Sequence, residues 1–177
     1  MITDSANEPG NVGPDHLAQE FRASVARGGD QPAYVFLDQD LEPSAVLSFA
    51  ELGDAVETLA RRLSETLAPG DRVLLAFHND PDAVLLFWAC VLVGVIPVPA
   101  PAPEPRNALR LSGMAQDAGV ALGLASASHV GAAREHIATI PWTTAASVLS
   151  PNPQPFARLA GPVSYTHLRA HETWLTI

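Results

Sequence analysis

The chain has 177 residues, of which 47% are hydrophobic. It contains no lysine and has a formal net charge of -9. Phosphate binding needs clustered basic side chains, but only Arg61 and Arg62 are adjacent, so we expect a solvated helix face there and no nucleic-acid partner. The one cysteine, Cys90, excludes an internal disulfide framework and a cysteine-based zinc site. It lies in an apolar run, which favours a buried and inert thiol.

We expect neither a targeting signal nor a membrane span. Residues 1–13 are polar and lack the basic start of a signal peptide. The longest apolar run, 83–96, is shorter than the roughly 20 residues that cross a bilayer, which favours a buried helix followed by a buried strand. The sequence therefore predicts a cytoplasmic protein, with disorder over 1–14, where polar residues show no periodicity.

The first predicted elements are a short helix and a hairpin. A helix over 15–25 is indicated by apolar residues four apart on one face, namely Leu17, Phe21 and Val25. Gly28–Gly29 ends this helix. The hairpin strands cover 33–37 and 45–47, and the polar segment 38–44 between them predicts a turn.

A longer helix follows the hairpin. Ser48 and Glu51 have the spacing of a capping box, in which the hydroxyl and the carboxylate each bind a free backbone N–H. The helix after them carries one apolar stripe, formed by Leu52, Val56, Leu59, Leu63 and Leu67. Ala68–Gly70 contains a proline and a glycine and is predicted to stop the helix.

The middle of the chain predicts a strand, a helix and a second strand. Residues 72–77 are apolar after the leading arginine, as in a strand buried on both faces of a parallel sheet. The segment 78–81 predicts a loop, an N-cap and a proline at the first helical position. The helix covers about 81–93, and a short strand covers 95–98. Every second residue from Pro97 to Pro105 is proline, so this segment cannot continue a central strand or a helix.

The remaining pattern predicts a helix over 107–118, a strand over 120–124, a helix over 129–140 and a strand over 146–149. Strands that alternate with helices imply right-handed crossovers and a parallel sheet. The predicted fold class is therefore α/β, with 15–162 forming the amino-terminal, incomplete part of a doubly wound, mainly parallel sheet flanked by helices.

Motifs that carry chemistry are few. The sequence contains no glycine-rich phosphate loop and no nucleophile elbow. His78 follows a predicted strand end, where α/β proteins bind ligands, but no nucleophile is spaced to pair with it, so a surface histidine is the simpler interpretation. His129 and His136 would share a helix face, yet without a third ligand they make a poor metal site. We assign no catalytic, cofactor-binding or metal-binding residue.

Residues 163–173 resemble the translation of a transposon adapter used to build sequencing libraries. The composition changes at the same place, because 163–177 hold two of the six histidines and one of the two tyrosines. We therefore expect 163–177 to be a non-native tail and exclude it from fold analysis. His167 and His171 are four apart but lie in this tail, so we discard a metal hypothesis for them.

Four stretches carry a family resemblance. They are Leu47–Leu52 at the start of a predicted helix, Gly70–Leu75 at the turn into a strand, Phe87–Pro99 across a helix, a glycine and a strand, and Arg106–Leu122 across the next helix and strand. In order and spacing they resemble the adenylate-forming acyl ligases. The proline-rich loop after the third stretch is longer than in many acyl-CoA synthetases and favours the fatty acyl-AMP ligase branch.

The resemblance implies an ATP- and Mg²⁺-dependent ligase. In this family the carboxylate of a fatty or other carboxylic acid attacks the α-phosphate of ATP, and the acyl group then passes to a thiol of an acyl carrier protein, of a polyketide or peptide synthase, or of coenzyme A. The family's phosphate loop, adenine-binding aromatic residue, ribose-binding aspartate and catalytic lysine lie downstream of the resembling stretches. No family functional residue is therefore carried onto this chain, and we expect it to be inactive alone.

Four hypotheses stay open. The parent protein is a fatty acyl-AMP ligase, an acyl-CoA synthetase or a nonribosomal-peptide adenylation domain; or the chain is a stand-alone α/β binding module. A downstream carrier-protein domain favours the peptide synthetase, and an insertion specific to acyl-AMP ligases argues against coenzyme A. As an incomplete domain, the chain is also expected to leave an open sheet edge and exposed apolar faces.

Overall fold

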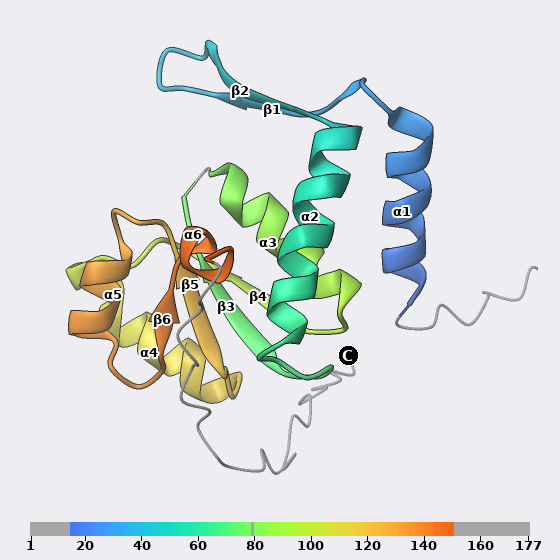
Figure 1. Ribbon diagram of the computed structural model, residues 1–177. Helices are drawn as coiled ribbons and strands as arrows, with labels where there is room; N and C mark the ends of the chain where they lie inside the picture. Colours follow the sequence, from blue (N-terminus) through green and yellow to red (C-terminus); the bar gives the residue numbers. More distant parts are fainter. Residues whose placement is uncertain (1–14, 79, 151–177) are drawn as a thin grey trace, which may run out of the picture.

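The computed structural model describes residues 15–78 and 80–150 (Figure 1). The disorder expected for 1–14 and the non-native tail expected for 163–177 lie outside these residues. The elements, in chain order, are α1 (His16–Gly28), β1 (Pro32–Leu37), β2 (Pro43–Ser48), α2 (Phe49–Ser64), β3 (Arg72–Ala76), α3 (Pro81–Leu92), β4 (Ile96–Ala100), the 3₁₀ turn η1 (Pro105–Asn107), α4 (Ala108–Asp117), β5 (Leu122–Ala125), α5 (Val130–His136), β6 (Trp142–Thr143) and α6 (Ala145–Val148).

Helix α1 lies beside α2 but buries a face that differs from the predicted one. Ala18 and Phe21 are 6% and 5% exposed, whereas Leu17 is 48% exposed, so its placement on the buried face is wrong. Phe21 is buried as predicted and Val25 packs against the same core, so the error is confined to Leu17, whose place Ala18 takes. Gly53 of α2 lets the two helices approach, because a Cβ there would lie 2.6 Å from Val25 Cγ1.

The predicted hairpin is confirmed as the antiparallel pair β1 and β2, with Val35 opposite Val46. The Asp38 carboxylate closes the turn, because it accepts the backbone N–H groups of Asp40 at 2.9 Å and of Glu42 at 3.0 Å. Pro43 is the first residue of β2 rather than part of the turn. The hairpin is a separate two-stranded sheet that runs from the upper ends of α1 and α2 across the top of the view in Figure 1.

The start of α2 is confirmed as a capping box. Ser48 Oγ accepts the backbone N–H of Glu51 at 3.2 Å, and Glu51 Oε2 accepts the backbone N–H of Ser48 at 2.9 Å. Four residues of the predicted stripe, Leu52, Val56, Leu59 and Leu63, are at most 2% exposed. The helix ends at Ser64, before the predicted stop, and Gly70 lies instead in the turn before β3, where its N–H donates to Gly94 O at 2.8 Å.

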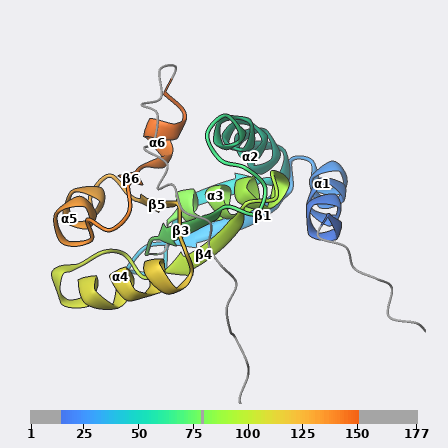
Figure 2. The same cartoon turned by 90° about the horizontal axis from the view of Figure 1, so that it is seen from below.

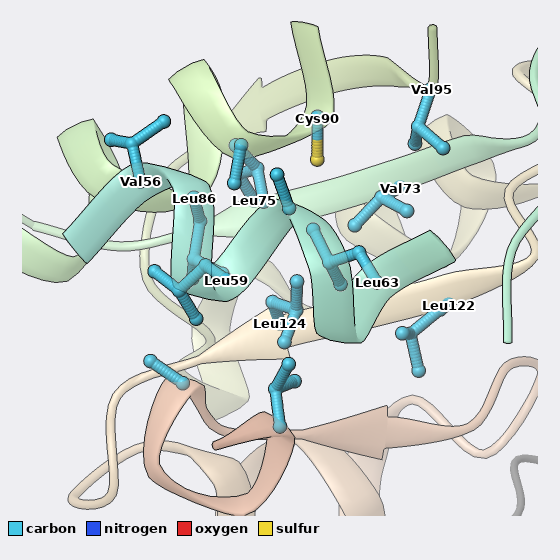
Figure 3. Packing of buried hydrophobic residues seen from close by; sticks show 14 of the residues in the cluster. Val56, Leu59, Leu63, Val73, Leu75, Leu86, Cys90, Val95, Leu122 and Leu124 are labelled. Atoms are coloured by element: carbon cyan, nitrogen blue, oxygen red, sulfur yellow. The ribbon is translucent and has the colours of Figure 1, made fainter. Parts of the chain in front are cut away.

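The four-stranded sheet is parallel throughout, in the order β4-β3-β5-β6. Side chains of β3 alternate between its two faces: Val73 and Leu75 pack with α2 and α3, and Leu74 and Ala76 pack with α4 and α5. Figure 2 shows α2 and α4 on opposite sides of the sheet. Figure 3 shows from close by the core between the sheet and helices α2 and α3. The predicted class, a doubly wound parallel sheet flanked by helices, is confirmed.

Strand β4 is longer than predicted and contains both Pro97 and Pro99. In the described part of the sheet it is an edge strand, paired only with β3. The N–H of Ile96 points toward the β3 side, where it donates to Asp71 O at 2.8 Å. Because N–H directions alternate along a strand, the two prolines stand where a donor would face away from β3.

The last predicted elements need correction. The helix predicted over 129–140 is only α5, and the strand predicted over 146–149 is wrong, because 145–148 form α6. Thr144 Oγ1 accepts the Ser147 N–H at 3.1 Å and caps that turn. The fourth strand, β6, lies earlier, where Trp142 pairs with Gly123.

Candidate functional site

The strand order creates one point where connections leave the sheet in opposite directions. From β3 the chain crosses through α3 to β4, and from the neighbouring β5 it crosses through α5 to β6. Helices α3 and α5 pack on opposite faces. The connections that follow β3 and β5 therefore lead to opposite faces of the sheet. The crevice between such connections, at the carboxyl ends of the strands, is the usual ligand site of open α/β sheets.

Two histidines meet at this crevice. His78 follows β3 and His129 precedes α5, and their ring centroids are 5.2 Å apart with the planes at 77°. His129 Nδ1 lies 2.8 Å from Ser126 Oγ and 3.0 Å from Ser128 Oγ, which fixes the ring orientation. The pairing of two histidines that are 51 positions apart follows from the sheet order and is invisible to local sequence patterns.

The loop after β4 brings an acid and a base to the same edge. Glu104 Oε1 lies 3.7 Å from His78 Nε2, and the other carboxylate oxygen pairs with Arg106. Asn107 holds this loop, because its Oδ1 accepts the Glu104 N–H at 2.9 Å and its amide donates to Ala102 O at 2.9 Å. No sequence pattern singled out Glu104, Arg106 and Ser126. Only Ser126 carried a usable signal, which is its position just after the strand predicted over 120–124.

The start of α3 adds carboxylates close to the crevice. Asp80 is the predicted N-cap, and its carboxylate accepts the Asp82 N–H at 2.9 Å; Asn79 lies outside the described residues. Burial, together with the nearby Asp80 carboxylate, raises the pKa of Asp82. The start of this helix is therefore already occupied by acidic side chains and does not attract a further anion.

An apolar cavity of about 310 Å³ opens beside His78. Its walls come from the hairpin, β3, α3 and β4, and include Tyr34, Phe77, Val84, Phe87 and Trp88. The Trp88 indole N–H donates to the Tyr34 hydroxyl at 3.1 Å, which ties the hairpin to α3. A second cavity of about 310 Å³ lies between the hairpin, α1 and α2, and shares Tyr34 and Trp88.

The other residues singled out by sequence do not join this site. Cys90 is fully buried, and burial raises the pKa of its thiol to about 12, so it is no nucleophile at neutral pH. His136 is near Glu135 at 4.0 Å, at the other end of α5 from His129. Within 15–78 and 80–150, no group of three or more His, Cys, Asp or Glu side chains has the arrangement of a metal site.

The described residues at this edge have the features of a small-molecule site. It joins an apolar cavity to a polar rim that contains His78, His129 and the Glu104–Arg106 pair. Such a combination of an apolar wall and a few convergent polar groups is typical of small-molecule sites. Among the described helices, none is long and apolar enough to cross a membrane.

Residues 21–160 match the family model described as "AMP-binding enzyme". A nonribosomal peptide synthetase of Aspergillus terreus is 34% identical over 86 residues, which cover 48% of this chain and 8% of that protein. An anthranilate–CoA ligase of Pseudomonas aeruginosa is 50% identical over 38 residues, which cover 22% of this chain and 7% of that protein.

A solved fatty acyl-adenylate ligase from L. pneumophila, in complex with acyl adenylate and pyrophosphate, has the same fold over this part. The TM-score is 0.66 at 23% identity, over 75% of this chain. The chain spans only 23% of that ligase and less than a tenth of either curated relative.

Proposed function

This chain belongs to the AMP-binding enzyme family, and we propose that it forms the amino-terminal part of a ligase that activates a carboxylic acid with ATP. The observation that carries the proposal is the family match over residues 21–160. The parallel sheet and its helices support it, because they resemble part of a fatty acyl-adenylate ligase. In such a reaction the acid's carboxylate attacks the α-phosphate of ATP, and acyl-AMP and pyrophosphate form.

We propose a fatty acid as the substrate and a carrier-protein thiol as the acyl acceptor. The fatty acyl-adenylate ligase among the solved structures supports the first, and the peptide synthetase among the relatives supports the second. Coenzyme A is the second candidate acceptor, and the 38-residue segment that is 50% identical to an anthranilate–CoA ligase favours it.

The described residues do not fit Mg-ATP on their own. The chain has no lysine, and its described part holds neither a glycine-rich phosphate loop nor a group of side chains suited to a metal. We therefore propose that the nucleotide and Mg²⁺ bind elsewhere in a longer protein. The contribution of this chain is the sheet scaffold and the crevice at its carboxyl edge.

Acid-dependent exchange of pyrophosphate into ATP tests the proposal. A longer protein in which this segment continues into the rest of a ligase is expected to exchange pyrophosphate only when a carboxylic acid is present. The purified 177-residue chain is expected to show no exchange above background. Exchange by the short chain alone would contradict its proposed inactivity, and no exchange by the longer protein with any acid would contradict the ligase itself.

A further inference from the structure

We propose that the cavity beside His78 binds the hydrocarbon or aryl part of an apolar carboxylic acid, with the carboxylate at the sheet edge. This inference rests on the proposed function for the choice of an acid as the ligand. The position of the cavity, its wall and its rim come from the structure alone. The cavity opens where β3 and its neighbour β4 end, on the face of the sheet that α3 covers.

The wall of the cavity suits an apolar group. Leu75 comes from β3 and Phe77 follows it, Val84 and Phe87 come from α3, and Tyr34 comes from the hairpin. The volume of about 310 Å³ is at the lower end of the range for small-molecule sites, which matches a short alkyl chain or a single aromatic ring.

The aromatic wall is held in place before any ligand binds. Trp88 donates its indole N–H to the Tyr34 hydroxyl, stacks on Phe21 with the ring centroids 4.6 Å apart, and meets Phe87 edge-on at 5.5 Å. A wall fixed on two sides keeps its shape when empty, so binding costs little ordering of side chains.

The rim decides the orientation of the ligand. Inside the cavity a carboxylate would have no charged partner, whereas at the rim it meets His78, whose side chain is 61% exposed. The nearby acids are already engaged: Glu104 with Arg106 and, at 3.7 Å, with His78 itself, and Asp80 with the Asp82 N–H. The apolar tail therefore points inward, and the carboxylate stays beside the imidazole in contact with water.

Calorimetric titration of the 177-residue chain with hexanoate, heptanoate and octanoate tests the apolar wall. Each added methylene that enters the cavity is expected to tighten binding about fourfold. Once the hydrocarbon tail of the acid fills the cavity, longer acids are expected to bind no more tightly. Absence of saturable one-to-one binding, as when the groove is covered by another polypeptide segment, overturns the proposal, and so does an affinity that does not depend on chain length.

Two wall variants test the location. Ala83→Phe fills the cavity from α3 and is expected to weaken octanoate binding at least tenfold, whereas Ala146→Phe adds the same ring to the exposed face of α6 and is expected to leave it unchanged. Val84→Thr keeps the shape of the wall but adds a hydroxyl, and is expected to weaken octanoate binding about fivefold. This variant tests the location even if Ala83→Phe does not fold. Equal affinities for all four proteins overturn the location.

The rim is tested by comparing octanoate with 1-octanol. The chain is expected to bind the acid at least threefold more tightly, and His78→Ala is expected to remove that preference while the binding of 1-octanol stays the same. Equal binding of acid and alcohol by the unchanged chain overturns the choice of an acid. None of these titrations needs ATP, so binding of octanoate here, together with no pyrophosphate exchange by a longer protein with any acid, refutes the proposed function and leaves the cavity assignment standing.

Discussion

The four-stranded sheet and the β1–β2 hairpin are built from similarly apolar residues, yet one is buried and the other is open. Leu74 and Leu122 in the sheet are 0% exposed, whereas Val35 and Val46 in the hairpin are 52% and 51% exposed. The parallel sheet has helices on both faces, and the hairpin is backed on one side only. Burial is thus set by what covers a strand and not by its composition.

The hairpin has little support of its own. Neither β1 nor β2 contains a charged residue. Natural edge strands are commonly protected by charges or bulges, and an isolated two-stranded sheet is only marginally stable. The hairpin therefore depends on Tyr34, Trp88 and the start of α2 for its position, while the sheet depends on its own core.

The largest expected difference between the two regions is the cost of removing an apolar side chain. Leu74→Ala is expected to lower the free energy of unfolding by about 3 kcal/mol, because it leaves a cavity between the sheet and α4. Val46→Ala, at a half-exposed hairpin position, is expected to change it by less than about 0.5 kcal/mol. Urea denaturation measures both, and equal losses would contradict the comparison.

A pair of glycines sharpens the account of sheet packing. A Cβ at Gly123 of β5 would lie 2.5 Å from Trp142 Cε3, so Gly123→Ala is expected to cost about 2 kcal/mol through overpacking. Gly113 in α4 faces open space, and Gly113→Ala is expected to stabilise the protein by about 0.5 kcal/mol. Thermal unfolding of the two variants is expected to give shifts of opposite sign; a Gly123→Ala variant as stable as the unchanged chain would show that β6 does not pack closely on β5.

The joint between the hairpin and α2 is expected to show a smaller effect. Ser48→Ala removes the hydroxyl that accepts the Glu51 N–H and is expected to cost about 1 kcal/mol. Ser48→Asp keeps a capping acceptor and serves as the control. A Ser48→Ala variant as stable as the unchanged chain in urea would show that the capping box is dispensable.

The same joint predicts a small dependence of stability on pH. Hydrogen bonds from the Ser48 backbone and hydroxyl lower the pKa of Glu51 below its ordinary value of 4.5. A carboxyl group with a lowered pKa in the folded state stabilises the fold above that ordinary value, and this contribution is lost as the pH falls through the lowered pKa. Glu51→Gln should therefore show a smaller stability loss on acidification below pH 4.5 than the unchanged chain, as followed by circular dichroism.

Sequence patterns predicted elements best where local chemistry determines the structure. The capping box at Ser48, the proline at the start of α3 and the apolar stripe of α2 depend on neighbours a few positions apart, and all three are confirmed. The misassigned segment 146–149 is a short apolar run, which strands and buried helical turns share. Only the cap at Thr144 and the earlier β6 distinguish the two.

The candidate site was less accessible to such patterns. His78 could be placed at a strand end, but its contact with His129 depends on β5 lying next to β3, which only the order of the strands in space determines. Glu104 lies in the proline-rich segment 97–105 and Arg106 directly follows it, and this segment predicted neither a helix nor a strand that would place them. Residues that meet because several strands end at one edge cannot be grouped from one sequence until the strand order is known.

Sequencing the source DNA across the Pro162–Val163 junction with long reads tests most directly whether this chain is part of a larger ligase. The account predicts that the frame continues past residue 162 into a loop rich in serine, threonine and glycine, and that the residues from Val163 onward are replaced. A genomic frame that encodes Val163–Ile177 followed by a stop codon would contradict it and favour a short α/β binding module.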